Sequence, residues 1–475
     1  MPTTSLPLPP LDLDPAIHGQ ARRLHMGLRA AILSGRLAPG RALPSSRALA
    51  GQLGLGRNMV VEAYEQLAAD GLTEARPGAG TFVAASLPPP PHEAPAQPPQ
   101  PDLWDRRQEA FALGQTEATP DLLARLGAAT RRAIAQAGPD LLSYGDPRGS
   151  PALRREIAAF LAAHRGLACD PDCIVVVSGT QHGLRLCLDA LLPDGAPVWM
   201  EDPGYTTSRD TLIAAGMSPV PVPVDAAGID VAAGRALSPQ AVAAYVTPSH
   251  QFPLGRTLEM TRRVQLIDWA RSTGAWILED DYDSEFRYAG PPLSALAGLA
   301  PDHVIYIGTF AKMVFPGLRI GYLVLPPRAL RPVLAARAAL DRFSAPFLQE
   351  ALAELMREGH LARHLRRVGR SYRTARDLLA AELRESSGGA LVPEVPDQGL
   401  HMVVRAGPGL SPRALAKLRR SDGPVLRLLS DCRFGPPGEE ALILGFSGHD
   451  LTAIRRGARS LGKAARRLLD GPTGV

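Results

Sequence analysis

Lysine is rare in this chain of 475 residues: only Lys312, Lys417 and Lys463 occur, and arginine carries nearly all the positive charge. Lys312 lies between two apolar, strand-like runs, in the segment IYIGTFAKMVFPGLRIGYLVLP that begins at residue 305. A lysine amine can form a Schiff base with an aldehyde, whereas an arginine guanidinium cannot. Lys312 is therefore the first candidate for covalent chemistry.

The neighbours of Lys312 indicate which aldehyde it would take. Thr309 precedes it and Arg319 follows it. A hydroxyl and a guanidinium beside an amine suit a phosphorylated aldehyde, because they can hold the phosphate while the lysine takes the carbonyl. Pyridoxal phosphate has these groups, and it also needs an acid for its ring nitrogen and an aromatic ring to stack on. Tyr205, in the segment EDPGYTT, supplies the aromatic ring.

Several carboxylates are crowded into EDDYDSEF, residues 279–286, directly after the apolar run AWIL. Like charges repel one another, so packing does not explain the cluster. One interpretation is a metal site, but no histidine falls nearby at ligand spacing, and we expect no metal. The alternative is that one carboxylate holds a protonated heteroaromatic nitrogen while Tyr282 bonds a neighbouring oxygen.

Seven β-rich apolar runs follow residue 151, and helix-like stretches such as residues 183–192 and 260–272 lie between several of them. This alternation predicts an α/β domain with a largely parallel sheet covered on both faces. Ligands of such sheets bind at the carboxyl ends of the strands. The turn SGTQHG, residues 178–183, follows one run and leads into a helix, which makes it a potential anion site. The runs are CIVVV, APVWM, SPVPVPV, AVAAYV, AWILE, HVIYIG and RIGYLVL.

A proline-rich segment, LPPPPHEAPAQPPQPD at residues 87–102, divides the chain. Proline favours the extended polyproline II conformation, so the segment is expected to be a semi-rigid spacer. We therefore predict a head at residues 1–86, a linker at 87–120 and an effector and dimerisation domain at 121–475. The last would comprise a large subdomain of about 150–330 and a small one of about 331–475.

The head has the pattern of a winged helix-turn-helix. Helical periodicity or helix start signals occur at residues 20–34, after Pro44, and from Arg57 to the stop at Gly71; a hairpin with the tip PGAG follows. Arg57 and Asn58 open the third helix, from which side chains can reach base edges or phosphates in a major groove. Arg76 and the glycines of the wing tip would approach the minor groove or phosphates.

Over nearly its whole length the head resembles the DNA-binding domain of GntR-type bacterial regulators. The motifs that carry the resemblance are SGRLAPG, LPSSRALA, AYEQLAADGL and GAGTFV. Gly56 and Met59 depart from it, because the family more often has hydroxyl residues around the Arg-Asn pair. The resemblance implies that double-stranded DNA is contacted by Ser46, Arg47, Arg57, Asn58, Arg76 and Gly78.

From about residue 121 onward the chain resembles fold type I aminotransferases, through YGDPRGSPALRREIAAFL, EDPGY, TPSHQFPLG, LEDDYDSEF and IGTFAKMVFPGLRIGY. Joined to a GntR-type head, these motifs are similar to the MocR group of regulators. The resemblance implies that pyridoxal 5'-phosphate binds Lys312 through its aldehyde, Asp280 through its ring nitrogen and Tyr282 through its phenolic oxygen, and stacks on Tyr205. Its phosphate would be held by Gly179, Thr180, Gln181, Thr309 and Arg319, with Tyr144 reaching the phosphate site of the neighbouring subunit in a homodimer.

Two departures from ordinary aminotransferases bear on chemistry. Phe252 stands before Pro253 where the enzymes carry an asparagine that contacts the phenolic oxygen. The strand LILGFSG lacks the late arginine that grips a substrate carboxylate. Arg427 and Arg433 lie upstream of it, and either could serve that role for an effector.

These residues favour a transcriptional regulator over an enzyme. We expect the aminotransferase-like domain to sense an amino acid, an amine or pyridoxal phosphate itself; the alternatives are an active aminotransferase with an accessory DNA-binding domain and a regulator with a vestigial site. The start MPTTSLPLPPLDLDP lacks a signal-peptide pattern, no window has the apolar length of a membrane span, and the four cysteines read as free thiols, so a cytoplasmic protein is expected. The sequence does not indicate which effector or operator the protein binds, or whether the protein activates or represses transcription.

Overall fold

The computed structural model describes residues 8–11, 13–87, 110–419 and 426–470. The chain divides into two compact units, Met1–Pro101 and Asp102–Val475. Of the predicted proline spacer at residues 87–102, only Leu87 is among the described residues, and the structure describes the predicted linker again from residue 110 onward. No helix in the described ranges combines the length and apolar character needed to cross a bilayer.

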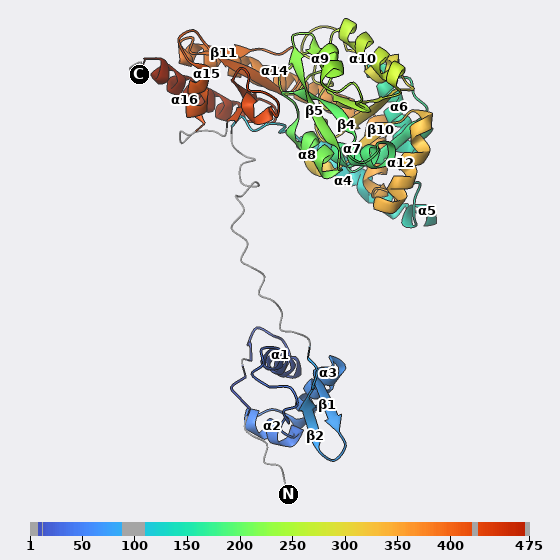
Figure 1. Ribbon diagram of the computed structural model, residues 1–475, viewed down its shortest axis with the longest axis vertical. Helices are drawn as coiled ribbons and strands as arrows, with labels where there is room; N and C mark the ends of the chain where they lie inside the picture. Colours follow the sequence, from blue (N-terminus) through green and yellow to red (C-terminus); the bar gives the residue numbers. More distant parts are fainter. Residues whose placement is uncertain (1–7, 12, 88–109, 420–425, 471–475) are drawn as a thin grey trace. The chain divides into compact units, whose positions relative to one another are not determined.

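The N-terminal unit is the predicted winged helix-turn-helix (Figure 1). Helices α1 (Gln20–Leu33), α2 (Ser46–Leu53) and α3 (Arg57–Ala69) are followed by the antiparallel hairpin of β1 (Thr73–Arg76) and β2 (Gly80–Val83). Both α1 and α2 pack on α3. Leu24, Leu28 and Val60 are fully buried between them. The Tyr64 hydroxyl donates to the Pro44 carbonyl at 2.8 Å and so ties α3 to the start of α2.

A sheet of eight strands forms the centre of the second unit, in the order β3-β10-β9-β8-β7-β4-β5-β6. Every apolar run identified in the sequence is one of these strands. The pairs from β9 to β5 are parallel, whereas β10 is antiparallel to both of its neighbours. The bounds are β3 Ile174–Val177, β4 Pro197–Asp202, β5 Ser218–Asp225, β6 Gly228–Ile229, β7 Ala243–Val246, β8 Trp276–Asp281, β9 Val304–Thr309 and β10 Gly321–Val324.

Helices cover both faces of this sheet, as predicted. Successive residues of β3 enter two different cores: Ile174 and Val176 pack in one, Val175 and Val177 in the other. In Figure 1, α9 and α10 lie on one side of β4 and β5, and α7 and α8 on the other. The helices are α4 Pro120–Ala135, α5 Pro139–Leu142, α6 Pro151–Arg165, α7 Thr180–Leu191, α8 Thr206–Ala214, α9 Val231–Leu237, α10 Met260–Thr273, α11 Leu296–Leu299, α12 Pro327–Leu340 and α13 Pro346–Arg357.

The C-terminal part is a second layer with its own core. An antiparallel sheet, β11-β12-β14-β13, packs with α14 (His360–Ser387) and α16 (Leu451–Asp470), which lie side by side (Figure 1). Phe111 is buried in this core, and its carbonyl accepts from the Gly445 amide at 3.0 Å. Residues 110–119, which the sequence placed in the linker, therefore pack against this unit. The remaining bounds are β11 Leu391–Glu394, β12 His401–Ala406, α15 Pro412–Leu418, β13 Arg427–Leu428 and β14 Ala441–Gly445.

Candidate functional site

A cavity of about 340 Å³ lies where β8, β9 and the start of α7 meet. A parallel sheet exposes the carboxyl ends of its strands at one edge, which is where polar groups can converge on a ligand. The structure brings nearly all the predicted cofactor residues together here. Those lining the cavity are Gly179, Thr180, Gln181, Tyr205, Asp280, Tyr282, Thr309, Lys312 and Arg319.

The Lys312 amine projects into this cavity from the segment after β9. Its Nζ donates to the Gly114 carbonyl at 3.1 Å. A Cβ atom built on Gly114 would lie 2.3 Å from that Nζ, and the backbone there has φ of +71°, so both space and conformation favour glycine. Burial lowers the pKa of Lys312, an effect that the charges of Asp283 and Asp280 oppose. Burial thus shifts the amine toward its neutral, nucleophilic form.

Asp280 lies at the end of β8 with 4% of its surface exposed. Burial raises its pKa to about 7, although the hydrogen bond from Tyr245 acts in the opposite direction. The Tyr245 hydroxyl donates to Oδ2, and the buried Oδ1 has no hydrogen-bond partner among the described residues. One oxygen of this carboxylate is therefore available to a ligand.

The sequence analysis did not predict a chain of hydrogen-bonded polar groups that ends at Asp280. Ser208 Oγ donates to the Tyr245 hydroxyl at 2.8 Å, and Gln181 Nε2 donates to Ser208 Oγ at 3.2 Å. The only signal was Tyr245 itself, a polar-tipped residue within the predicted strand AVAAYV. This chain of hydrogen bonds leads from Gln181, which lines the cavity, to Asp280 and fixes the position of its carboxylate.

The other end of the cavity has the features of an anion site. Gly179, with φ of +99°, precedes α7, so the free amides at the start of this helix face the cavity. A Cβ atom on Gly179 would lie 3.6 Å from the Arg319 guanidinium. The Arg319 amide donates to the Pro316 carbonyl at 3.4 Å, but its guanidinium makes no hydrogen bond or ion pair with another described residue. Thr309 Oγ1 accepts from the Ala311 amide at 3.1 Å, which leaves its own proton to donate.

No histidine stands at ligand spacing beside residues 279–286 in the sequence, but the fold brings His250 into contact with them. His250 Nδ1 lies 2.9 Å from Asp283 Oδ2, and Tyr282 donates its hydroxyl to the His250 carbonyl at 3.0 Å. His250, Asp283 and His401 each place one potential ligand atom within 4.8 Å of the others. Sequence spacing hid this cluster because the fold brings together three segments that are far apart in the chain. Burial lowers the pKa of His401 to about 3, so its ring is neutral.

The structure distinguishes between the two arginines that were expected to bind an effector carboxylate. Arg427 lines the cavity, and its Nη2 donates to Thr206 Oγ1 at 2.8 Å. Its guanidinium carbon lies 5.9 Å from the ring centroid of Phe252, which also lines the cavity. Arg433 is not one of the lining residues. Tyr144 also lies outside the cavity: it is 77% exposed, and its ring contacts Phe343 edge-on with centroids 6.2 Å apart.

The predicted DNA-contact residues gather on the surface of the N-terminal unit. Arg57 and Asn58 are exposed in the first turn of α3, and Arg57 Nε lies 3.5 Å from Ser46 Oγ at the start of α2. Arg47 is exposed next to Ser46. At the hairpin, Arg76 pairs with Glu74 and lies 4.5 Å from the Phe82 ring centroid, while Gly78 has φ of +74°.

Comparison with known proteins accounts for both units. The family "Bacterial regulatory proteins, gntR family" matches residues 20–83, and "Aminotransferase class I and II" matches residues 111–417. The chain is 35% identical, over 95% of its length and 94% of the relative's, to the probable rhizopine catabolism regulatory protein MocR of Rhizobium meliloti. The chain belongs to the MocR group of GntR-type transcriptional regulators.

Further comparisons agree with this placement. This MocR-type regulator is 33% identical to the pyridoxine biosynthesis transcriptional regulator PdxR of Corynebacterium glutamicum, over 96% of each chain. Among solved structures it is similar to LysN, an α-aminoadipate aminotransferase from Thermus thermophilus, at a TM-score of 0.67 and 26% identity over 76% of this chain and 93% of that one. The protein is thus a DNA-binding regulator whose larger unit has the aminotransferase fold.

Proposed function

We propose that this regulator binds pyridoxal 5'-phosphate in the Lys312 cavity and that the occupied cavity reports on a small amino-bearing molecule. One observation carries the proposal. The cavity presents an amine, a carboxylate oxygen and a guanidinium that lack strong partners, and these complement the aldehyde, ring nitrogen and phosphate of that cofactor. The related LysN structure contains N-(5'-phosphopyridoxyl)-L-leucine, a compound of the same cofactor.

Each part of the cavity would have a separate role. When bound, the cofactor supplies an aldehyde that condenses with a primary amine. Lys312 would provide that amine, Asp280 would hold the ring nitrogen, and Tyr282 would bond the phenolic oxygen. Tyr205, which lines the cavity and contacts the Phe252 ring edge-on with centroids 5.4 Å apart, would stack on the cofactor ring. The phosphate would be held by Gly179, Thr180, Gln181, Thr309 and Arg319.

The effector would carry a primary amine and a carboxylate. Arg427 is the better placed of the two candidate arginines, because it lines the cavity and Arg433 does not. Phe252 offers no hydrogen bond where aminotransferases have an asparagine, and its ring makes this wall apolar. A cavity of this kind favours recognition of the amino compound over its rapid conversion.

The output would be a change in DNA binding by a homodimer. Ser46, Arg47, Arg57, Asn58, Arg76 and Gly78 would form the contact surface for double-stranded DNA. Tyr144 is exposed, and its side chain makes no hydrogen bond with another described residue. Such a side chain is free to reach a neighbouring subunit. For the effector to act, the two states of the dimer must differ in how they present the DNA-binding heads.

The scarcity of lysine makes the cofactor proposal simple to test. Purified full-length protein loaded with pyridoxal phosphate should absorb in the visible range, and borohydride should then attach the cofactor permanently to the peptide that contains Lys312. Lys312→Ala should abolish both signals, whereas Lys417→Ala, an exposed lysine in α15, should retain them. Visible absorption that survives Lys312→Ala, or cofactor trapped on Lys417 or Lys463, would contradict the proposal.

A further inference from the structure

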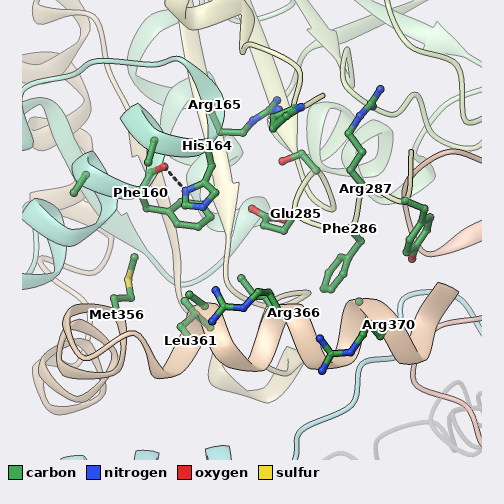
Figure 2. A pocket seen from close by; sticks show the side chains of 18 of the residues that line it. Phe160, His164, Arg165, Glu285, Phe286, Arg287, Met356, Leu361, Arg366 and Arg370 are labelled. Carbon is green, nitrogen blue, oxygen red and sulfur yellow. Dashed lines mark hydrogen bonds between the residues drawn. The ribbon is translucent and has the colours of Figure 1, made fainter. Parts of the chain in front are cut away.

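A second cavity, of about 720 Å³, lies in the same unit but is lined by a different set of residues from the Lys312 cavity. The last turns of α6 and the segment 284–292 after β8 form one side, and α14 forms the other (Figure 2). Its volume lies within the range of small-molecule sites, about 300–1,000 Å³. No step of the proposed cofactor chemistry uses this space.

The α14 side of the second cavity carries two cations without partners. Arg366 and Arg370 are four residues apart and therefore lie on one face of the helix, as Figure 2 shows. Neither side chain makes a hydrogen bond or ion pair with another described residue. The other arginines of the cavity are occupied: Arg373 donates to the Tyr288 carbonyl, Arg287 to Gln398 Oε1 at 2.8 Å, and Arg165 pairs with Asp281 at 2.8 Å.

Acidic groups in the second cavity do not neutralise this charge. Glu156 and Glu285 line it, and neither forms an ion pair with a described residue. Burial raises the pKa of Glu285, which favours its uncharged form. The buried Oγ of Ser284 and Nε of Arg287 also have no hydrogen-bond partner in the described ranges. Polar groups thus remain available, and the balance of charge is positive.

Apolar side chains cover the floor between these groups. Phe160, Met356 and Leu365 are partly exposed in the second cavity, and Phe286 points from the opposite side toward α14 (Figure 2). An apolar floor beside two free guanidiniums is complementary to a molecule with an aromatic or alkyl body and an anionic end. A fully hydrated inorganic ion would make no favourable contact with these apolar side chains.

We propose that the second cavity is a binding site for a small amphipathic anion, a carboxylate, sulfonate or phosphate with an apolar body, whose anionic group is held by Arg366 and Arg370. The site is separate from the Lys312 cavity and does not depend on cofactor binding there. Both cavities nevertheless share one segment: Asp280 and Tyr282 line the first, and Ser284–Tyr288 line the second.

The proposal is tested with two fluorescent probes that differ by one charge. 8-Anilinonaphthalene-1-sulfonate has an aromatic body and a sulfonate, and N-phenyl-1-naphthylamine has the same body without it. Binding of each to full-length protein is followed by fluorescence titration. Arg366→Gln/Arg370→Gln should weaken binding of the sulfonate probe by about tenfold, as expected for the loss of charge-assisted hydrogen bonds. Binding of the neutral probe should remain nearly unchanged.

Matched variants locate the probe. Arg367→Gln/Arg384→Gln removes the same charge from exposed positions of α14 outside the second cavity, and Arg319→Gln removes one of the cations of the Lys312 cavity. Both should leave the affinity of the sulfonate probe within about twofold, since distant exposed charges interact weakly in salt. Ala362→Trp, which places a large ring in the second cavity, should weaken both probes.

Three results would overturn the proposal. The sulfonate probe could lose affinity equally in the two double variants, which would indicate a general charge effect. It could lose affinity in Arg319→Gln instead, which would place it in the Lys312 cavity. Random-sequence duplex DNA could displace it and itself bind more weakly to Arg366→Gln/Arg370→Gln, which would assign these arginines to DNA phosphates. None of these outcomes bears on whether Lys312 binds the cofactor.

Discussion

Replacing Asp280 by asparagine should make the cofactor-free protein more stable and should weaken the cofactor binding that we propose for this residue. Asp280 is buried, and its pKa is raised from 3.8 to about 7, chiefly by that burial. A carboxyl whose pKa is higher in the folded than in the unfolded protein binds more protons when folded. Stability is therefore highest below the unfolded pKa and falls as the pH rises from about 4 to about 7.

The size of the effect follows from that shift. A difference of about three units corresponds to about 4 kcal/mol lost by the native protein above pH 7, at about 1.4 kcal/mol per unit. Asparagine removes this loss, because it is neutral at every pH. Its amide protons would lack partners in the cavity, at a cost of about 1–3 kcal/mol. We therefore expect Asp280→Asn to gain about 1–3 kcal/mol in free energy of unfolding at pH 8.

The assay is denaturant unfolding of protein freed of cofactor with hydroxylamine, at several pH values between 5 and 8. The advantage of Asp280→Asn should grow with pH and level off near pH 8. Asp268→Asn, an exposed carboxylate on α10 without a partner among the described residues, should change stability by less than about 0.5 kcal/mol. A variant less stable than the native protein at pH 8, or a difference independent of pH, would refute the reasoning.

Three further predictions concern the head and the effector site. Arg57→Ala should weaken binding to an operator selected from a random duplex library by about tenfold or more, measured by fluorescence anisotropy, with cofactor absorption unchanged. Tyr64→Phe removes the 2.8 Å hydrogen bond to the Pro44 carbonyl, and should lower the stability of the head by about 1 kcal/mol in thermal unfolding; an unchanged midpoint would contradict this. Arg427→Gln should abolish the spectral response of the loaded protein to amino acids but not to simple amines, whereas Arg433→Gln should leave both responses intact.

Much of the fold could be predicted because its signals are local. The strands of the large sheet are buried on both faces, so they read as continuous apolar runs, and each run proved to be a strand. The three helices and hairpin of the head were likewise marked by helical periodicity, helix stop signals and glycines. Residues 110–119 were harder to assign, since they have no periodicity of their own. Their place is set by Phe111, which enters a core built from residues far along the chain, such as Tyr372 and Phe446.

The site was predicted only as far as motifs and chemistry allow. Lys312, Asp280 and Arg319 stand in recognisable segments at strand ends, and the structure brings them to one cavity. Tyr245 was overlooked because an aromatic residue in a buried strand gives no sign of the carboxylate it contacts. The contact of His250 with Asp283 was overlooked for a related reason: parallel strands place segments 33 residues apart at the same edge. Such pairings follow from the order of strands in the sheet, which the sequence does not state.

The central claim is that occupancy of the Lys312 cavity controls DNA binding. The direct measurement is operator affinity of cofactor-free and cofactor-loaded protein, for the native chain, Lys312→Ala and the control Lys417→Ala. We predict that loading, or adding an amino acid to the loaded protein, changes the affinity by about fivefold or more in the native chain and the control, and leaves Lys312→Ala unaffected. Equal affinities in every state of the native chain, or the same shift in Lys312→Ala, would contradict the claim.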